Sequence, residues 1–158
     1  MARRALILMA AAALAAMTAA APPVSAAIGW RISARADCAS AAADKTLAFA
    51  SGRIVTMLGP DGKKLWSWQA PADVSFLERG PEASVYAAYS DTLTKLDAKG
   101  KYLWSATAYE RIYSLLVLAD GKAVAGSGYG ALAFDTGGKK VWESDPQNAV
   151  YPIYDCAT

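Results

Sequence analysis

Three tryptophans recur at a fixed interval in this chain of 158 residues. Trp66, Trp104 and Trp142 lie 38 positions apart, in the strings LGPDGKKLW, LDAKGKYLW and FDTGGKKVW. In each string a glycine stands four positions before the tryptophan, and these glycines are Gly62, Gly100 and Gly138. A fixed period of about 40 residues is typical of repeat architectures with four short strands per unit. The spacing therefore predicts an array of similar all-β units.

The third unit shows the expected four strands most clearly, over 112–118, 123–127, 131–135 and 139–143. A three-residue hairpin loop needs a left-handed residue at its last position, and glycine adopts that conformation without a Cβ clash. The glycine column therefore marks the turn before the fourth strand of each unit. The tryptophan that follows lies in that strand, where its large ring is expected to fill the space between one sheet and the next.

Units of four strands that end in apolar-Asp-x-x-Gly-Lys-x-apolar-Trp resemble blades of the pyrroloquinoline-quinone-like (quinoprotein-type) β-propeller repeat family. LDAKGKYLW is the closest copy, and LGPDGKKLW has Gly59 where the aspartate usually stands. The resemblance covers about residues 36–144. It implies an all-β, β-propeller-like array of four-stranded antiparallel blades. Such blades occur in quinone-dependent dehydrogenases and in scaffold proteins of outer-membrane assembly, so the resemblance implies a fold and no single function.

The N-terminus has the layout of a secretory signal peptide over residues 1–26. Arg3 and Arg4 precede an alanine-rich apolar stretch, and Val24-Ser25-Ala26 offers small residues for cleavage. We therefore expect a periplasmic or secreted protein without a membrane anchor after cleavage. The two arginines account for the formal net charge of +2. The remaining chain is neutral, which gives it no electrostatic reason to bind nucleic acid or an anionic membrane.

Residues 27–158 are expected to form a single repeat domain. Its predicted blades cover about 36–70, 73–108 and 111–146. A partial fourth blade combines 148–156, which aligns with a first strand, and 28–33, which aligns with a last strand. Three blades are fewer than closed rings of the family contain, so three outcomes stay open: a small four-bladed ring, a homodimer that completes a larger ring, or a truncated gene product.

Cys38 and Cys156 are the two cysteines of the chain, one near each end of the predicted domain. In an exported protein an even pair favours a disulfide, and the alternative is two free thiols. In the chain-entropy model, a disulfide that closes so long a loop stabilises the folded state by up to about 4–5 kcal/mol.

The chain contains no histidine. This removes the commonest general base and the commonest metal ligand. Features of the quinone-dependent enzymes cannot be matched here residue by residue, so we assign no catalytic residue, metal ligand or cofactor.

Tyrosines suggest a binding face near the predicted central channel. Tyr113 and Tyr151 share a repeat column in the innermost strand, and Tyr109, Arg111 and Tyr154 lie beside them in sequence. Tyrosine and arginine suit recognition because they combine a large contact area with polar groups. The alternative is that these rings fill the core between blades.

These observations favour an exported, non-catalytic β-propeller-like binding or scaffold module that recognises a protein or small ligand. The alternative is a degenerate or oligomer-completed fragment of a pyrroloquinoline-quinone-dependent dehydrogenase. The sequence does not name the ligand or the partner.

Overall fold

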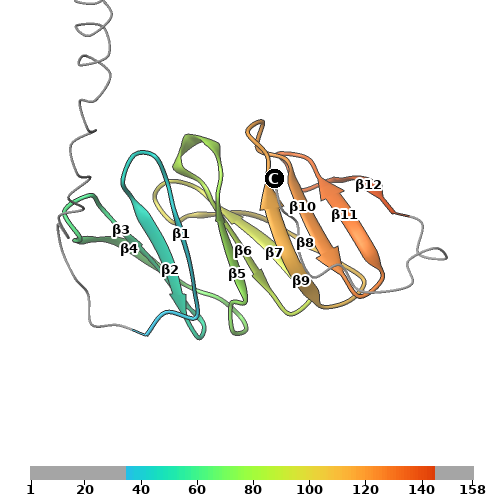
Figure 1. The fold of residues 1–158 in the computed structure, drawn as a ribbon, viewed down its shortest axis with the longest axis horizontal. Coiled ribbons are helices and arrows are strands. Elements are labelled where there is room, and N and C mark those ends of the chain that lie inside the picture. The colour runs from blue at the N-terminus through green and yellow to red at the C-terminus, as the bar shows by residue number, and fades with distance from the viewer. Residues whose placement is uncertain (1–34, 145–158) are drawn as a thin grey trace, which may run out of the picture.

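A computed structural model describes residues 35–144 of the chain. In this part of the chain, three four-stranded antiparallel sheets follow one another in chain order (Figure 1). The predicted all-β array of four-stranded antiparallel blades is therefore confirmed. The predicted signal peptide and both segments of the predicted fourth blade, 28–33 and 148–156, lie outside the described residues.

Each blade is a simple meander of four consecutive strands. The first blade consists of β1 (Cys38–Ala41), β2 (Leu47–Ser51), β3 (Ile54–Leu58) and β4 (Lys64–Gln69). The second consists of β5 (Phe76–Arg79), the 3-10 turn η1 (Pro81–Ala83), β6 (Val85–Tyr89), β7 (Thr92–Leu96) and β8 (Tyr102–Thr107). The third consists of β9 (Ile112–Val117), β10 (Ala123–Ser127), β11 (Gly130–Phe134) and β12 (Lys140–Glu143).

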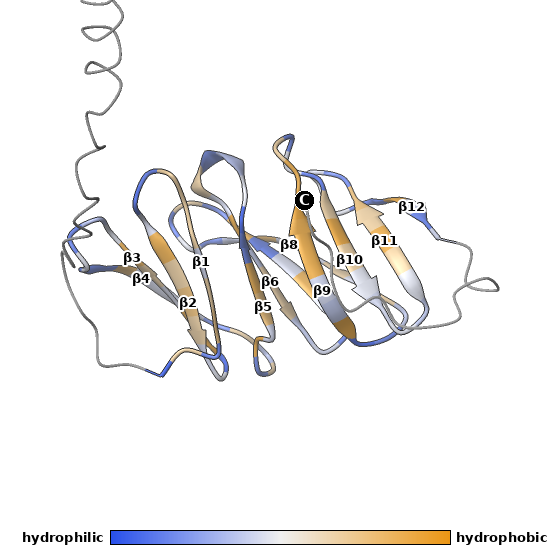
Figure 2. Ribbon diagram, viewed as in Figure 1, coloured by the Kyte–Doolittle hydropathy of each residue, from blue (hydrophilic) through white to orange (hydrophobic). Residues whose placement is uncertain are grey.

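The blades approach one another most closely at their first strands, because β1 lies against β5 and β5 lies against β9. Buried alanines on the second strands let neighbouring sheets come close together, and they include Ala48, Ala50, Ala87, Ala88, Ala123 and Ala125. Two apolar clusters result, one between the first and second blades and one between the second and third. Figure 2 shows apolar residues along strands such as β2 and β9, with hydrophilic residues at many turns.

The first strand of the second blade is shorter than the sequence suggests. By its likeness to the third unit, the second unit is predicted to begin with a strand over 73–79, but β5 begins at Phe76. The preceding backbone is used to tie the blades together, since the Val74 N–H donates to the Gly52 carbonyl at 2.9 Å. The Ser75 N–H instead donates within the second blade, to the Ala88 carbonyl of β6 at 2.8 Å.

The turns before the fourth strands have the left-handed glycine that the loop requires. The φ angles of Gly62, Gly100 and Gly138 are 76°, 78° and 84°. In the second blade the Asp97 side chain supports the turn, because its Oδ1 accepts hydrogen bonds from the N–H groups of Lys101 and Lys99 at 2.9 and 2.8 Å. These backbone donors hold the pKa of Asp97 below its ordinary value.

Each glycine turn after the first also receives the tryptophan of the preceding blade. The Trp66 indole Nε1 donates to the Ala98 carbonyl at 2.8 Å, and the Trp104 Nε1 donates to the Thr136 carbonyl at 2.9 Å. A Cβ atom added to Gly100 would lie 2.6 Å from the Trp66 ring, and one added to Gly138 would lie 2.6 Å from the Trp104 ring. Tryptophan and glycine columns are therefore partners between successive units, and not within one unit.

Trp142 has the same register position in the third blade but a different environment. It is 54% exposed, whereas Trp66 and Trp104 are partly buried. Within residues 35–144 the third blade is the last, so no described turn lies under this ring.

The blade contact predicts different costs for two equivalent tryptophans. Trp104→Ala should lower the free energy of unfolding by about 3–5 kcal/mol, because it removes a ring docked between two blades. In dilute protein Trp142→Ala should change it by less than about 0.5 kcal/mol, as is usual for an exposed side chain. Chemical denaturation measures both. An unchanged denaturation midpoint for Trp104→Ala would contradict the docking role.

Candidate functional site

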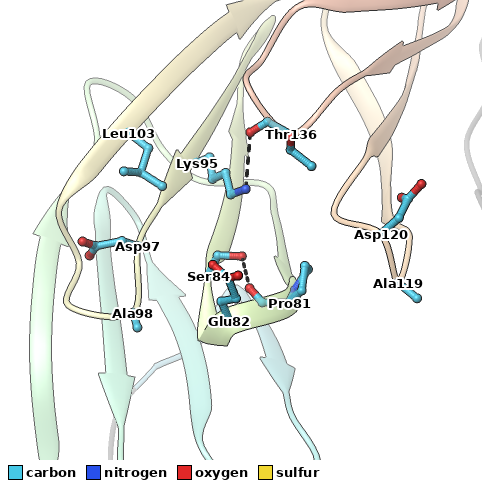
Figure 3. A pocket seen from close by; sticks show the side chains of 10 residues that line it. All are labelled: Pro81, Glu82, Ser84, Lys95, Asp97, Ala98, Leu103, Ala119, Asp120 and Thr136. Atoms are coloured by element: carbon cyan, nitrogen blue, oxygen red, sulfur yellow. Dashed lines mark hydrogen bonds between the residues drawn. The ribbon is translucent and has the colours of Figure 1, made fainter.

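A pocket of about 410 Å³ lies at the junction of the second and third blades, at the end that carries the glycine turns. It opens between η1, the end of β7, and the β9–β10 and β11–β12 turns (Figure 3). Its lining combines charged, polar and apolar side chains: Pro81, Glu82, Ser84, Lys95, Asp97, Ala98, Leu103, Ala119, Asp120 and Thr136.

Lys95 crosses the pocket from the second blade to the third. Its Nζ donates to the Thr136 carbonyl at 3.4 Å and lies 5.1 Å from the centroid of the Tyr86 ring. Tyr86 is fully buried, and its hydroxyl donates to the Gly121 carbonyl at 2.6 Å. The ammonium group is therefore fixed by a carbonyl oxygen and by the electron-rich face of a rigid ring.

The η1 loop that brings Glu82 to the pocket is held in an unfavourable backbone conformation. Glu82 and Ala83 have φ angles of 56° and 57°. A left-handed backbone at a residue with a Cβ costs about 1 kcal/mol or more of folding free energy. Ser84 holds the loop closed, because its Oγ donates to the Pro81 carbonyl at 2.7 Å. Such strain persists where the surrounding structure enforces it, and it is concentrated at functional sites.

The three lining carboxylates are not equivalent. Asp97 supports its own turn, as described above. Asp120 accepts hydrogen bonds from the Lys122 Nζ at 2.7 Å and the Lys122 N–H at 3.1 Å, which hold its pKa below the ordinary value. Glu82 is exposed, and within the described part of the chain we find no hydrogen bond or ion pair to its carboxylate. Glu82 is therefore the lining carboxylate best placed to meet a ligand.

The corresponding junction between the first and second blades is filled by an arginine. The Arg79 side chain is only 5% exposed. Its Nη2 donates to Thr46 Oγ1 at 3.0 Å and lies 3.8 Å from the Asp44 carboxylate, and its Nη1 donates to Met57 Sδ at 3.1 Å. Burial lowers the pKa of this guanidinium, and the charge of Asp44 opposes that effect.

One repeat later, the same four positions have different residues. Val117 stands 38 positions after Arg79 and is packed against the second apolar cluster. The partners of Arg79 are replaced in the same way: Glu82 follows Asp44, Ser84 follows Thr46 and Lys95 follows Met57 at the same interval. All three replacements line the pocket. The pocket is therefore lined by the residues equivalent to the partners of Arg79, at a junction that has no equivalent arginine.

Tyr109, which the sequence places beside the predicted channel, contacts the outer strand of the third blade. It lies in the connection between β8 and β9 and is 64% exposed. Its hydroxyl accepts a hydrogen bond from the Lys140 Nζ at 2.7 Å, and the same ammonium lies 4.7 Å from its ring centroid. Lys140 also pairs with Glu143. Glu143 and then Tyr109 raise the pKa of Lys140.

The other predicted binding residues are spread over the described and undescribed parts of the chain. Arg111 is exposed just before β9, and Tyr113 lies partly buried within β9, the first strand of the third blade. Tyr151 and Tyr154 lie outside the described residues, so a shared tyrosine face stays a prediction. Sequence reasoning missed the Glu82–Lys95 pocket, although aligning Arg79 with Val117 at the 38-residue period would have indicated it.

Two further kinds of feature, a cluster of metal-binding side chains and a helix able to span a membrane, are absent from residues 35–144. This part of the chain contains no group of three or more Cys, Asp or Glu side chains arranged to hold a metal ion. It also contains no helix with the length and apolar character needed to span a bilayer.

Comparison with known proteins gives no matching family model and no matching curated protein. Solved structures do match. BamB from Moraxella catarrhalis is 17% identical with a TM-score of 0.61, over 68% of this chain and 37% of that chain. A protein of unknown function from Bacteroides caccae is 18% identical with a TM-score of 0.51, over 67% and 44%. The chain thus matches less than half the length of either structure, and the likeness shows a β-propeller-like fold alone.

Cys38 provides a test of local burial on β1. Its Sγ lies 3.8 Å from the Val74 carbonyl, and burial followed by the nearby charge of Asp37 raises the pKa of the thiol from 9.0 to about 11. Cys156 lies outside the described residues, so a disulfide between the two stays a prediction.

In reduced protein carrying Cys156→Ala, we expect iodoacetamide to modify Cys38 about a hundredfold more slowly than an ordinary cysteine near neutral pH, because the thiolate is the nucleophile. The rate should keep rising with pH toward about 11. Mass spectrometry follows the reaction. A rate that levels off near an ordinary pKa of 9.0 would show that Cys38 is not buried in this way.

Proposed function

We propose that this protein is an exported, non-catalytic β-propeller-like module that binds a polypeptide partner. We further propose that the pocket between the second and third blades accepts an arginine side chain of that partner. The observation that carries the proposal is the repeat equivalence of the two blade junctions. One junction contains the guanidinium of Arg79, and the other presents Glu82 and Ser84 at the equivalent positions around open space.

The chemistry of the lining supports a basic peptide side chain as the ligand. A carboxylate and a hydroxyl are the acceptors that a guanidinium prefers, as Asp44 and Thr46 illustrate with Arg79. Pro81 and Leu103 contribute apolar groups to the same lining, and these suit the aliphatic part of an arginine side chain. Lys95 opposes the binding of a cation, but its ammonium is already engaged by Thr136 and Tyr86.

Export and family membership belong to the same proposal. The signal-peptide layout of residues 1–26 supports a periplasmic or secreted location, and in that location a disulfide between Cys38 and Cys156 is favoured. The blade motif supports membership of the pyrroloquinoline-quinone-like repeat family. No observation within residues 35–144 favours the alternative of a dehydrogenase fragment. Saturable binding of pyrroloquinoline quinone with calcium would support that alternative instead.

A matched pair of peptides tests the pocket. A short peptide with one arginine should shift the NMR signals of Glu82, Lys95 and Asp120, and the same peptide with neutral citrulline should not. Glu82→Gln should weaken binding roughly tenfold, because a charge-assisted hydrogen bond is worth about 1.5 kcal/mol or more. Asp61→Asn is the control, since Asp61 lies in the turn of the first blade outside the pocket.

Two further variants use the neighbouring junction as a template. Val117→Arg should supply an internal guanidinium at the position of Arg79 and abolish binding of the arginine peptide. Lys95→Met should place at this junction the side chain that Met57 has at the first junction. It should tighten binding of the arginine peptide, because it removes a positive charge that repels the guanidinium. Equal affinity of the arginine and citrulline peptides, or unchanged affinity in Val117→Arg, would contradict the proposed ligand.

A further inference from the structure

The ammonium group of Lys95 is the feature of the pocket that a bound guanidinium does not explain. At the first junction the equivalent residue is Met57, whose sulfur accepts a hydrogen bond from Arg79 Nη1. At the second junction a positive charge stands there instead, and it lines the pocket together with Glu82. The second junction thus presents two opposite charges to one opening, whereas the first junction pairs Asp44 with an arginine of its own.

The Lys95 ammonium keeps hydrogen-bond donors for a ligand. A lysine ammonium has three donors. One of them reaches the Thr136 carbonyl at 3.4 Å, which is long for a hydrogen bond to oxygen. The Tyr86 ring, whose centroid lies 5.1 Å from the nitrogen, attracts the charge through its face. Among the described residues we find no second hydrogen bond of this group, so donors remain for an acceptor that enters the pocket.

The carboxylates of the described residues do not neutralise Lys95. The ion pairs within residues 35–144 involve other lysines and arginines. Of the lining carboxylates, Asp120 is paired with Lys122, and Asp97 accepts hydrogen bonds from its own turn. In Figure 3 the Lys95 side chain and the η1 loop that carries Glu82 lie apart, on different sides of the opening. The Lys95 charge is therefore available to an anionic group of a ligand.

From these two opposite charges we infer that the pocket recognises an arginine together with a carboxylate of the same polypeptide, with Glu82 binding the guanidinium and Lys95 binding the carboxylate. The inference rests on the proposed function, because it adds a second group to the arginine that the pocket accepts. Ligand pockets commonly have volumes of about 300–1,000 Å³, so a pocket of about 410 Å³ accommodates two neighbouring groups. Lys95 is then a specificity-determining residue, since its charge-assisted hydrogen bond favours peptides that carry both groups.

A polypeptide can supply this carboxylate from two sources. In an extended peptide, residues two positions apart lie on the same face and are separated by about 7 Å along the chain. An acidic side chain two positions from the arginine therefore enters the same pocket. An arginine at the C-terminus of the partner brings its own α-carboxylate instead. Both sources place a carboxylate within about one side-chain length of the guanidinium.

Calorimetric titration of the full chain with four peptides tests this inference. The peptides have blocked ends and combine arginine or citrulline with glutamate or glutamine two positions later. The arginine–glutamate peptide should bind roughly tenfold more tightly than the arginine–glutamine peptide, because it adds a hydrogen bond between two charged groups. Two further peptides end in arginine, one as the free acid and one as the amide. Tighter binding of the free acid would identify the C-terminal carboxylate as a source.

Variants of Lys95 assign this preference to its ammonium group. Lys95→Met should bring the affinities of the arginine–glutamate and arginine–glutamine peptides to within about twofold of each other, because the charge that distinguishes them is gone. The variant should fold, since Met57 already stands at the equivalent position of the first blade. Lys95→Arg should keep the preference. Lys99→Met is the control, because Lys99 is an exposed cation of the neighbouring turn that does not line the pocket.

The outcomes separate this inference from the arginine pocket itself. If glutamate and glutamine peptides bind equally, and the free acid and the amide also bind equally, the inference is overturned. In that case weaker binding of the citrulline peptides would still support the arginine pocket. A preference for the carboxylate that persists in Lys95→Met would overturn the role of Lys95. Equal binding of arginine and citrulline peptides would overturn the proposed function and this inference together.

Discussion

The contact between an indole ring and the next blade's glycine turn is the interaction on which this array depends. Blades are closest at their first strands and need a large group to join their outer parts. The ring does this by stacking on the turn and donating Nε1–H to a turn carbonyl, as Trp66 does with Ala98. The glycine is therefore required twice, once for its left-handed φ and once because a Cβ would collide with the ring.

Successive blades share one backbone arrangement, but equivalent positions in them have different residues, so the junctions between blades differ chemically. Arg79 fills the first junction with a nearly buried guanidinium. Its Nε has no hydrogen-bond partner among the described residues, so the burial is only partly compensated. At the second junction Val117 stands in its place, and the charged group comes instead from Lys95, anchored on Tyr86 and Thr136. The open space beside Glu82 lies at this second junction, among the residues equivalent to the partners of Arg79.

The strands and blades could be predicted from the sequence because turn chemistry and spacing are local properties. The four-stranded units and the glycine turns follow from the strings around Trp66, Trp104 and Trp142. The pairing of each tryptophan with the following unit could not be predicted from one unit, because it depends on how two sheets are placed. The pocket was missed for a similar reason, since Glu82, Lys95 and Val117 are ordinary surface and core residues until two junctions are compared. Tyr109 was grouped with the first strand by sequence, but its contact with Lys140 depends on a tertiary neighbour in β12.

A double-mutant cycle on Trp104 and Gly138 measures the energy of the contact between the indole ring and the glycine turn. Gly138→Asn keeps a residue that tolerates the left-handed turn but adds a Cβ under the ring. If the ring occupies that space, the substitution should be strongly destabilising in the wild-type background and clearly less so in the Trp104→Ala background, where only the cost of the left-handed backbone remains. We predict a coupling energy of about 1 kcal/mol or more from denaturation of the four proteins. Additive effects at the two positions would contradict it.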